Sequence, residues 1–157
     1  MEIGFAQGRD IPGIIGLLRQ VGEVHHQIRP DLFRAGAQKY DEAALEGLLA
    51  DSGRPILVAR EGEILAGYAF CMLQITENDP VLRDRKVLYI DDLCVDEGQR
   101  GRGVAGALYR EVCRYAEELG CDAVTLNVWC GNDRAMGFYE KCGLKPQKIG
   151  MEYLLRK

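Results

Sequence analysis

Residues 95–105, VDEGQRGRGVA, connect a run of aliphatic and β-branched residues to an amphipathic pattern. The run before this stretch, residues 86–95, favours a strand. After it, apolar residues recur at helical spacing and predict a helix that ends at Gly120: Val104, Leu108, Val112, Tyr115 and Leu119. A helix start presents unpaired N–H groups and the positive end of the helix dipole, and phosphate binds there readily. The stretch therefore predicts an anion-binding strand–loop–helix unit.

The start of this helix differs from the other expected helix starts. Those begin at residues whose side chains can cap their own first turn: Asp10, Asp41 and Asn132. The helix after Gly103 has Gly and Arg there instead, so its amides stay available, and Arg100 and Arg102 add positive charge. Glycine also lets the backbone approach an anion closely. The structural alternative is a tight turn with two solvated arginines.

The rest of the chain predicts short elements with no repeat and no linker. Strands are expected at residues 2–6, 56–59, 64–74, 86–95, 123–129 and, as one or two strands, 145–155. Helices are expected after Asp10, Asp41, Gly103 and Asn132. The strands at 56–59 and 64–74 are expected to form a hairpin. This order predicts a single α/β (α+β mixed) domain over residues 1–157, with a mixed central sheet and helices on both faces.

Composition restricts the class of protein. A chain of 157 residues is long enough for one hydrophobic core, and its formal net charge of -4 argues against nucleic-acid binding. No signal peptide or membrane span is visible, so a cytoplasmic location is expected. The six cysteines form no C-x-x-C pair, so we expect reduced thiols and no metal site.

Two stretches resemble the GNAT superfamily of N-acetyltransferases. Residues 100–105, RGRGVA, match its pattern Arg/Gln-x-x-Gly-x-Gly/Ala, and residues 132–144, NDRAMGFYEKCGL, resemble its Asn-x-x-Ala-x-x-Phe-Tyr-Glu-Lys-x-Gly-Phe segment. The strand at 88–95, LYIDDLCV, continues the similarity. Strand and loop together look most like polyamine and diamine acetyltransferases, although Asp91 stands where those enzymes have the longer Glu.

The resemblance implies a GNAT-like fold and an acetyl-CoA-dependent reaction without a metal. It implies that an acceptor amine attacks the acetyl thioester directly, with no acyl-enzyme. It also implies a set of residues that bind acetyl-CoA, the first three of them through their backbone along the pantetheine arm: Leu93, Cys94, Val95, Arg100, Gly101, Arg102, Gly103, Val104, Ala105, Asn132 and Tyr139. For Asn132 the alternative is a plain helix cap, and Cys94 itself is expected to be a buried thiol and not a nucleophile.

Tyr139 is the candidate general acid, because the family has this Tyr near the CoA sulfur. A phenol has a pKa of about 10 and a thiol a pKa of about 8.5. Proton transfer from the phenol to the thiolate is therefore uphill by roughly 2 kcal/mol in water. The alternative is a Tyr that only packs its helix face.

Asp91 is the candidate residue for the amine, either as an anchor for the ammonium or as a base acting through water. Direct proton transfer from a lysine-like amine to an ordinary Asp would cost roughly 9 kcal/mol. Period-two alternation predicts that Asp91 and Asp92 point to opposite faces, with Asp91 toward the acceptor. The alternative for Asp91 is a structural salt bridge to a Lys or Arg.

The acceptor is expected to be a small-molecule amine, because acidic residues at an open cleft suit a cationic molecule. A peptide or protein amine is the alternative within enzymes, and a CoA-binding regulatory domain without turnover is the alternative outside them. His25 and His26 either line the acceptor site beside Arg29 and Asp31 or form a solvated helix end. A homodimer is compatible with the sequence.

Overall fold

The computed structural model describes residues 1–156 and contains two compact units, Met1–Asn127 and Val128–Lys157. The first unit holds a five-stranded sheet in the order β1-β2-β3-β4-β5. Its strands are β1 (Glu2–Phe5), β2 (Ile56–Glu61), β3 (Ile64–Thr76), β4 (Arg85–Val95) and β5 (Ala123–Leu126). Neighbouring strands are antiparallel except β4 and β5, which are parallel, so the sheet is mixed as predicted.

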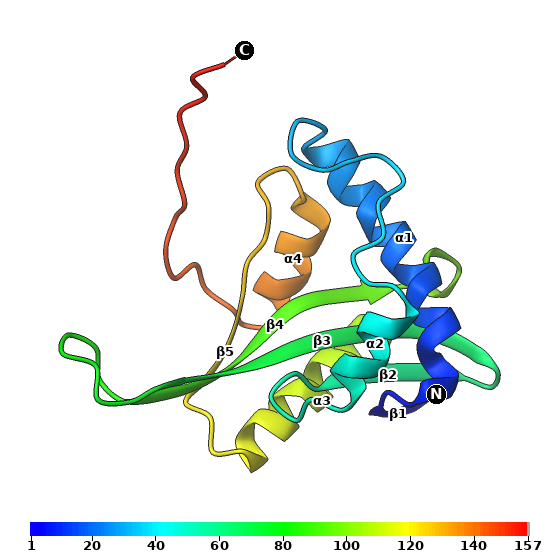
Figure 1. The fold of residues 1–157 in the computed structure, drawn as a ribbon, viewed down its shortest axis with the longest axis horizontal. Helices are drawn as coiled ribbons and strands as arrows, with labels where there is room; N and C mark the ends of the chain where they lie inside the picture. The colour runs from blue at the N-terminus through cyan, green and yellow to red at the C-terminus, as the bar shows by residue number, and fades with distance from the viewer. Residues whose placement is uncertain (157) are drawn as a thin grey trace. The chain divides into compact units, whose positions relative to one another are not determined.

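Helices cover both faces of this sheet (Figure 1). The helices α1 (Ile11–Ile28) and α2 (Glu42–Leu49) lie on one face, and α3 (Val104–Glu118) lies on the other. Two short 3-10 turns precede α1 and α3, at Gly8–Asp10 and Glu97–Gln99. The α/β class and the hairpin formed by β2 and β3 are confirmed.

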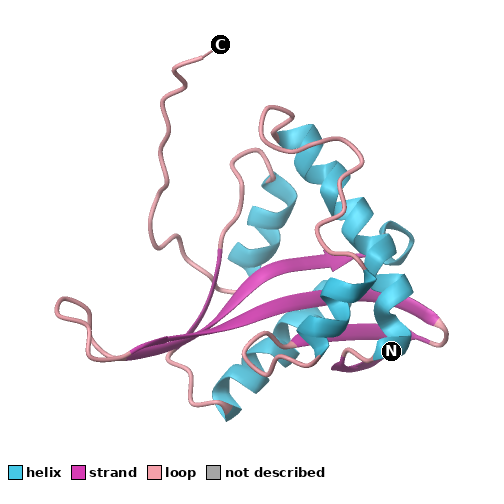
Figure 2. Cartoon of the chain, viewed as in Figure 1, coloured by secondary structure: helices cyan, strands magenta, loops and turns pink. Residues whose placement is uncertain are grey.

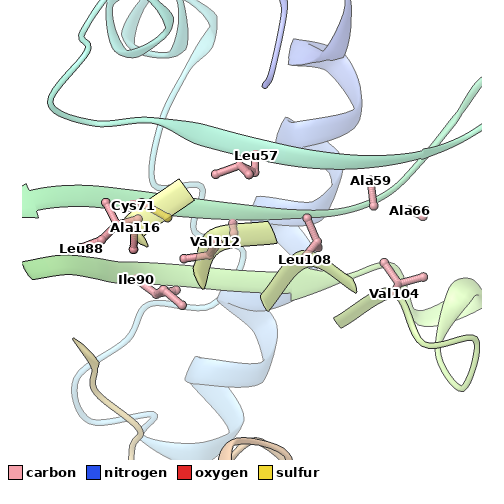
Figure 3. Close-up of a cluster of buried hydrophobic side chains, with 11 residues drawn as sticks. Leu57, Ala59, Ala66, Cys71, Leu88, Ile90, Val104, Leu108, Val112 and Ala116 are labelled. Carbon is pink, nitrogen blue, oxygen red and sulfur yellow. The ribbon is translucent and has the colours of Figure 1, made fainter. Parts of the chain in front are cut away.

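The apolar pattern after Gly103 buries one stripe of α3 against the sheet. The stripe consists of Val104, Leu108, Val112 and Ala116, which pack on Leu88 and Ile90 of β4 and on residues of β2 and β3 (Figure 3). Each buried Val or Leu contributes roughly 1.5–3 kcal/mol by leaving water. Gly67 allows this close approach, because a Cβ there would stand 2.8 Å from the Cys94 carbonyl oxygen and 3.0 Å from Leu108. The loop before α3 is thus held at the end of β4.

The opposite face carries a second core. Residues of α1, including Ile14 and Leu18, pack with Leu45 of α2 against Tyr68 and other side chains of the sheet. We call this the α1-side core. It matters for the site because Tyr68 and Cys94, on neighbouring strands, both belong to it.

The second unit contains one helix, α4 (Asp133–Lys141), which begins at Asn132 and is followed by Gly143 in the left-handed region with φ 94°. The strands predicted at residues 145–155 are wrong: within the described part of the chain, these residues form no strand (Figure 2). The strand predicted at 123–129 is also shorter, ending at Leu126. A strand needs a hydrogen-bonded neighbour, and side-chain alternation alone does not supply one.

Candidate active site

The loop between β4 and α3 has the geometry of an open helix start. Gly101 and Gly103 have φ angles of 80° and 78°, in the left-handed region that favours glycine. Gly103 is the N-cap of α3 and therefore offers no capping side chain. A Cβ built on either glycine meets no described atom within 4 Å, and residues 100–103 are exposed. The loop that leads into the first turn of α3 is therefore open to solvent.

Two other helices of the chain, α2 and α4, have side chains that cap their first turns. Asp41 accepts a hydrogen bond from the Ala44 amide at 2.8 Å, and Asn132 accepts one from the Ala135 amide at 3.2 Å. Asp10 is the N-cap residue of α1, as predicted, but its carboxylate makes no cap hydrogen bond to that helix and pairs instead with buried Arg60 at 2.6 Å. The contrast between α3 and the capped helices holds for α2 and α4.

Polar contacts fix the first half of the loop to α1. The Gln20 side-chain amide donates to Asp96 Oδ1 at 2.8 Å and its oxygen accepts from the Glu97 amide at 3.2 Å. Asp96 also accepts from the Gly98 amide at 3.0 Å. Arg102 reaches Gln99 Oε1 at 3.3 Å, and Arg100 is exposed beside it. The loop therefore presents two guanidinium groups and a set of amides from a fixed base.

The strand that leads into this loop has an edge that β5 leaves unpaired. Pairing between β4 and β5 runs from Val87–Ala123 to Ile90–Leu126 and stops there. Residues 92–95, which include the predicted pantetheine-binding Leu93, Cys94 and Val95, pair only with β3 among the described strands. Their backbone groups on the β5 side are thus suited to an extended ligand that hydrogen-bonds like a strand.

Cys94 is a buried thiol, as expected. Its Sγ lies 3.7 Å from the Leu17 carbonyl oxygen, to which the thiol can donate. Burial, followed by the charge of Asp92, raises the pKa of Cys94 to about 12. Since the thiolate is the nucleophilic form, this thiol is inert at neutral pH.

A β-bulge lies where the two adjacent carboxyls occur. In the register of β3 and β4, Phe70 pairs with Asp92 and Cys71 pairs with Ile90, so Asp91 is the extra residue. Ile90 belongs to the core that α3 covers and Leu93 packs against it, whereas Asp92 accepts a hydrogen bond from Tyr68 of the α1-side core. Asp91 reaches Lys39, in the connection between α1 and α2. The prediction of opposite faces is therefore wrong, because a bulge interrupts the period-two alternation.

The two carboxyls have different partners. Lys39 Nζ donates to Asp91 Oδ2 at 2.6 Å, with the side chains 51% and 23% exposed. Burial lowers the pKa of Lys39, but the hydrogen bond and the charge of Asp91 outweigh it, and the pKa is raised. The salt bridge considered for Asp91 thus exists, and its role toward an acceptor stays a prediction.

Asp92 is held by a phenol. Tyr68 is fully buried, and its hydroxyl donates to Asp92 Oδ2 at 2.6 Å. Burial raises the pKa of Asp92 even though the Tyr68 hydrogen bond and the charges of His25 and Lys39 act in the opposite direction. Burial, together with Asp92, raises the pKa of Tyr68 well above its usual value. The Asp92 carboxyl and the neutral Tyr68 hydroxyl that donates to it therefore lie on the α1 side of the sheet, the same side as Asp91.

The two histidines end α1 in different ways. His26 Nδ1 lies 2.8 Å from the Phe33 carbonyl oxygen, a hydrogen bond in which the ring N–H donates. The His25 ring packs against the Phe33 ring at 4.9 Å, and its charge acts on Asp92. Asp31 pairs with Arg29 at 2.7 Å. The charge of His25 therefore acts on the candidate site at Asp92.

Asn132 and Tyr139 belong to the second unit. Asn132 caps α4, which is the alternative considered for it, and Tyr139 lies in the last turns of that helix with its ring 5.1 Å from that of Phe138. Their roles toward acetyl-CoA stay predictions. In the first unit, the structure brings together Asp91 and the backbone of Leu93, Cys94 and Val95, followed directly by the loop from Arg100 to Ala105.

Sequence reasoning missed Lys39, Tyr40 and Tyr68. Tyr68 continues the apolar pattern of β3, so nothing in the sequence marks its hydroxyl as a partner of Asp92. Lys39 lies 52 residues from Asp91, in a segment without regular structure.

Within residues 1–156, no helix has both the length and the apolar character that a membrane crossing requires. The same residues include no group of three or more His, Cys, Asp or Glu placed to hold a metal ion.

Comparison with known proteins supports one family. Glucosamine 6-phosphate N-acetyltransferase 1 of rice is 28% identical over 142 residues, which cover 88% of this chain and 77% of the rice protein. The Escherichia coli L-amino acid N-acetyltransferase AaaT is 37% identical over 65 residues, 41% of this chain and 40% of that protein. The crystal structure of a mutant of the BH1408 protein of Bacillus halodurans is 32% identical and superposes with a TM-score of 0.94, covering 99% of this chain and 100% of the other.

The model of the acetyltransferase (GNAT) family matches residues 21–144, which include the bulged strand β4, the open start of α3 and the segment around Tyr139. That range is well over half of the chain. The mixed five-stranded sheet with four helices is the fold expected from it. The chain belongs to the GNAT acetyltransferase family and is an acetyl-CoA-dependent acyltransferase.

Proposed function

We propose that this protein transfers the acetyl group of acetyl-CoA to a small-molecule amine, with the amine held on the α1 side of β4. The observation that carries the proposal is the bulge at Asp91, which turns two carboxyls to one face just before the unpaired strand edge and the open helix start. Carboxylates at that position suit an acceptor that arrives as an ammonium ion.

The donor half of the site follows from the loop. Acetyl-CoA supplies an activated acetyl thioester when bound. The amides of residues 101–105 and the guanidinium groups of Arg100 and Arg102 suit its pyrophosphate, because a helix start with free N–H groups favours anions. The unpaired edge at residues 93–95 suits the amide-bearing pantetheine arm.

The acceptor half must hold an amine and let it lose a proton. Asp91 holds the ammonium, and the proton leaves through water, because direct transfer to an ordinary carboxylate costs roughly 9 kcal/mol. The amine nitrogen then attacks the thioester carbonyl carbon, the C–S bond breaks, and the leaving thiolate takes a proton from Tyr139. The N-acetyl product loses its remaining extra proton to water, and the Tyr139 phenolate takes a proton from water, which restores the phenol.

Two relatives favour a small molecule over a peptide as the acceptor. The rice protein is named for glucosamine 6-phosphate and the Escherichia coli protein for L-amino acids, both of which carry a primary amine. The similarity of residues 88–105 to polyamine and diamine acetyltransferases points to the same class.

A thiol-release assay with acetyl-CoA tests the proposal. The panel contains diamines and polyamines, amino acids, amino sugars and a lysine-containing peptide. Turnover with at least one small amine, and an N-acetyl product identified by mass spectrometry, is the expected result. Turnover with the peptide alone, or with no amine at all, would contradict the small-molecule assignment. Calorimetry with acetyl-CoA then separates a missing acceptor from a missing donor site.

A further inference from the structure

The ammonium group of Lys39 is bound in the way that a ligand ammonium would be. Its Nζ donates to Asp91 Oδ2 at 2.6 Å and lies 5.3 Å from the centre of the Tyr40 ring. The Tyr40 ring stacks on Phe70 of β3 with the ring centres 5.7 Å apart. A carboxylate and an aromatic face are the two groups that proteins use most readily for an alkylammonium ion. The chain therefore binds its own primary ammonium at the candidate acceptor site.

The Lys39 ammonium can leave Asp91 with only a small loss of free energy. Lys39 lies in the connection between α1 and α2, outside any helix or strand, and half of its side chain is exposed. Ion pairs with such exposure contribute little to stability, since solvent screens them and a long side chain must be held in place. The neighbouring Gln38 and Tyr40 keep separate contacts, with Arg19 and Phe70 respectively, that do not need the Lys39 ammonium.

Asp91 is also the only one of the two carboxyls without a buried partner. Asp92 is bound by the Tyr68 hydroxyl, which is fixed in the α1-side core. Asp91 meets a side chain that can rotate into solvent. An incoming ammonium ion can therefore exchange with Lys39 at Asp91 while the Tyr68–Asp92 hydrogen bond stays in place.

We propose that Lys39 is a specificity-determining residue whose ammonium group competes with that of the acceptor for Asp91, so that an acceptor binds only when Lys39 has moved away. The inference rests on the proposed amine acceptor at Asp91. Competition of this kind raises the apparent KM by the inverse of the fraction of molecules in which Asp91 is open. Competition from Lys39 disfavours acceptors that bind through the ammonium group alone. Acceptors that make further contacts with the protein can still displace Lys39.

Two substitutions of Lys39 test the competition. Lys39→Met keeps most of the aliphatic length and removes the charge, whereas Lys39→Arg keeps a cation that can pair with Asp91. Lys39→Met should lower the KM of the best amine of the panel about two- to fivefold with little change in kcat, as expected for release of an exposed ion pair. Lys39→Arg should stay near the unmodified protein. A KM that is unchanged or higher in Lys39→Met overturns the proposal, because Lys39 would then be neutral or would help to bind the acceptor.

A binding measurement without turnover separates this inference from the proposed function. Propylammonium chloride is titrated into each protein in the absence of acetyl-CoA and followed by NMR shifts of the Asp91 and Tyr40 amides. Lys39→Met should bind it about two- to fivefold more tightly than the unmodified protein, and adding Asp91→Asn should abolish the gain. Equal behaviour of the two proteins, including no binding to either, overturns the role of Lys39. Failure of every amine in the thiol-release assay overturns the acceptor assignment alone.

Discussion

Asp92 is an acid whose surroundings oppose its charge. Burial raises its pKa, and the Tyr68 hydroxyl and the more distant charges of His25 and Lys39 only partly offset this effect. For an acid whose pKa is raised on folding, the ionised form destabilises the fold. Its contribution to stability is therefore most favourable below the ordinary pKa of 3.8 and worsens as pH rises toward the raised value.

Asp92→Asn should consequently stabilise the protein at neutral pH. The amide keeps an oxygen that can accept from Tyr68 and carries no charge to desolvate. The melting temperature should rise by about 2–4 °C for each kcal/mol gained, and the gain should shrink as pH falls below the pKa of the native Asp92. Thermal melts of both proteins across the acid range measure it. Asp91→Asn, at a more exposed carboxyl, is the matched control and should give a smaller change at neutral pH. A gain that is constant with pH would show that ionisation of Asp92 is not the cause.

Tyr139 makes a separate residue-scale prediction, because it concerns the leaving thiolate and not the amine. Tyr139→Phe should lower kcat about 10²–10⁴-fold, the usual effect of losing a general acid, with a much smaller effect on acetyl-CoA affinity. Steady-state kinetics at saturating substrates and calorimetry with acetyl-CoA give the two quantities. Tyr153→Phe, at a side chain that is 87% exposed, is the control. Unchanged turnover in Tyr139→Phe would leave this Tyr with a packing role.

At the scale of elements, the candidate donor site depends on the junction of β4 and α3. Gly67 lets α3 lie close to the end of β4, Gln20 holds the loop from α1, and Gly103 turns the chain into the helix. In the proposed donor site, the first amides of α3 face the pyrophosphate with Gly103 at its positive φ of 78°. A side chain in that region costs roughly 1–2 kcal/mol per residue.

Gly103→Ala should therefore weaken acetyl-CoA binding by about tenfold, since 1.4 kcal/mol of strain at the binding conformation corresponds to that factor. Calorimetry at a temperature where the variant is fully folded gives the affinity. Gly16→Ala is the control: Gly16 is an exposed position inside α1 with no described atom within 4 Å of a Cβ, so alanine should add roughly 0.5–1 kcal/mol of stability and leave binding unchanged. Full affinity in Gly103→Ala would argue against the loop as the pyrophosphate site.

Elements with a strong local signal could be predicted from the sequence. The stripe of α3, the hairpin of β2 and β3, the Asp41 and Asn132 caps and the glycines after α3 and α4 all follow from spacing and side-chain chemistry. Features that depend on distant partners could not. The bulge at Asp91 follows from the register with β3, the Lys39 pair from a contact across 52 residues, and the missing C-terminal strands from the need for a paired neighbour.

At the scale of the whole molecule, one buried ion pair fastens the sheet of the first unit to its first helix. Arg60 of β2 donates to Asp10 at 2.6 and 2.9 Å and to the Phe5 carbonyl oxygen of β1 at 3.1 Å. Both charged side chains are less than a tenth exposed. The expectation that Asp10 would cap α1 missed this role, because Arg60 lies 50 residues away. The pair joins two strands and the start of α1, so its loss should affect cooperative unfolding of the entire unit.

Asp10→Asn should destabilise the fold by about 3–5 kcal/mol, because it removes the buried counter-charge of the Arg60 guanidinium. For a chain of this size, each kcal/mol lowers the melting temperature by about 2–4 °C. Glu2→Gln is the matched control: Glu2 also contacts Arg60, at 3.4 Å, but is 70% exposed, so its loss should have little effect.

The pH dependence of the stability adds a second test. Burial raises the pKa of Asp10, but the hydrogen bonds from Arg60 and Gln7 and the charge of Arg60 outweigh it, and the pKa is lowered. The contribution of Asp10 is therefore complete above its ordinary pKa of 3.8 and disappears as pH falls through the lowered value. Denaturant unfolding of both variants should show the Asp10→Asn deficit at neutral pH and its convergence with the parent in acid. A deficit that persists in acid would mean that the shape of the Asp10 side chain, and not its charge, holds α1 to the sheet.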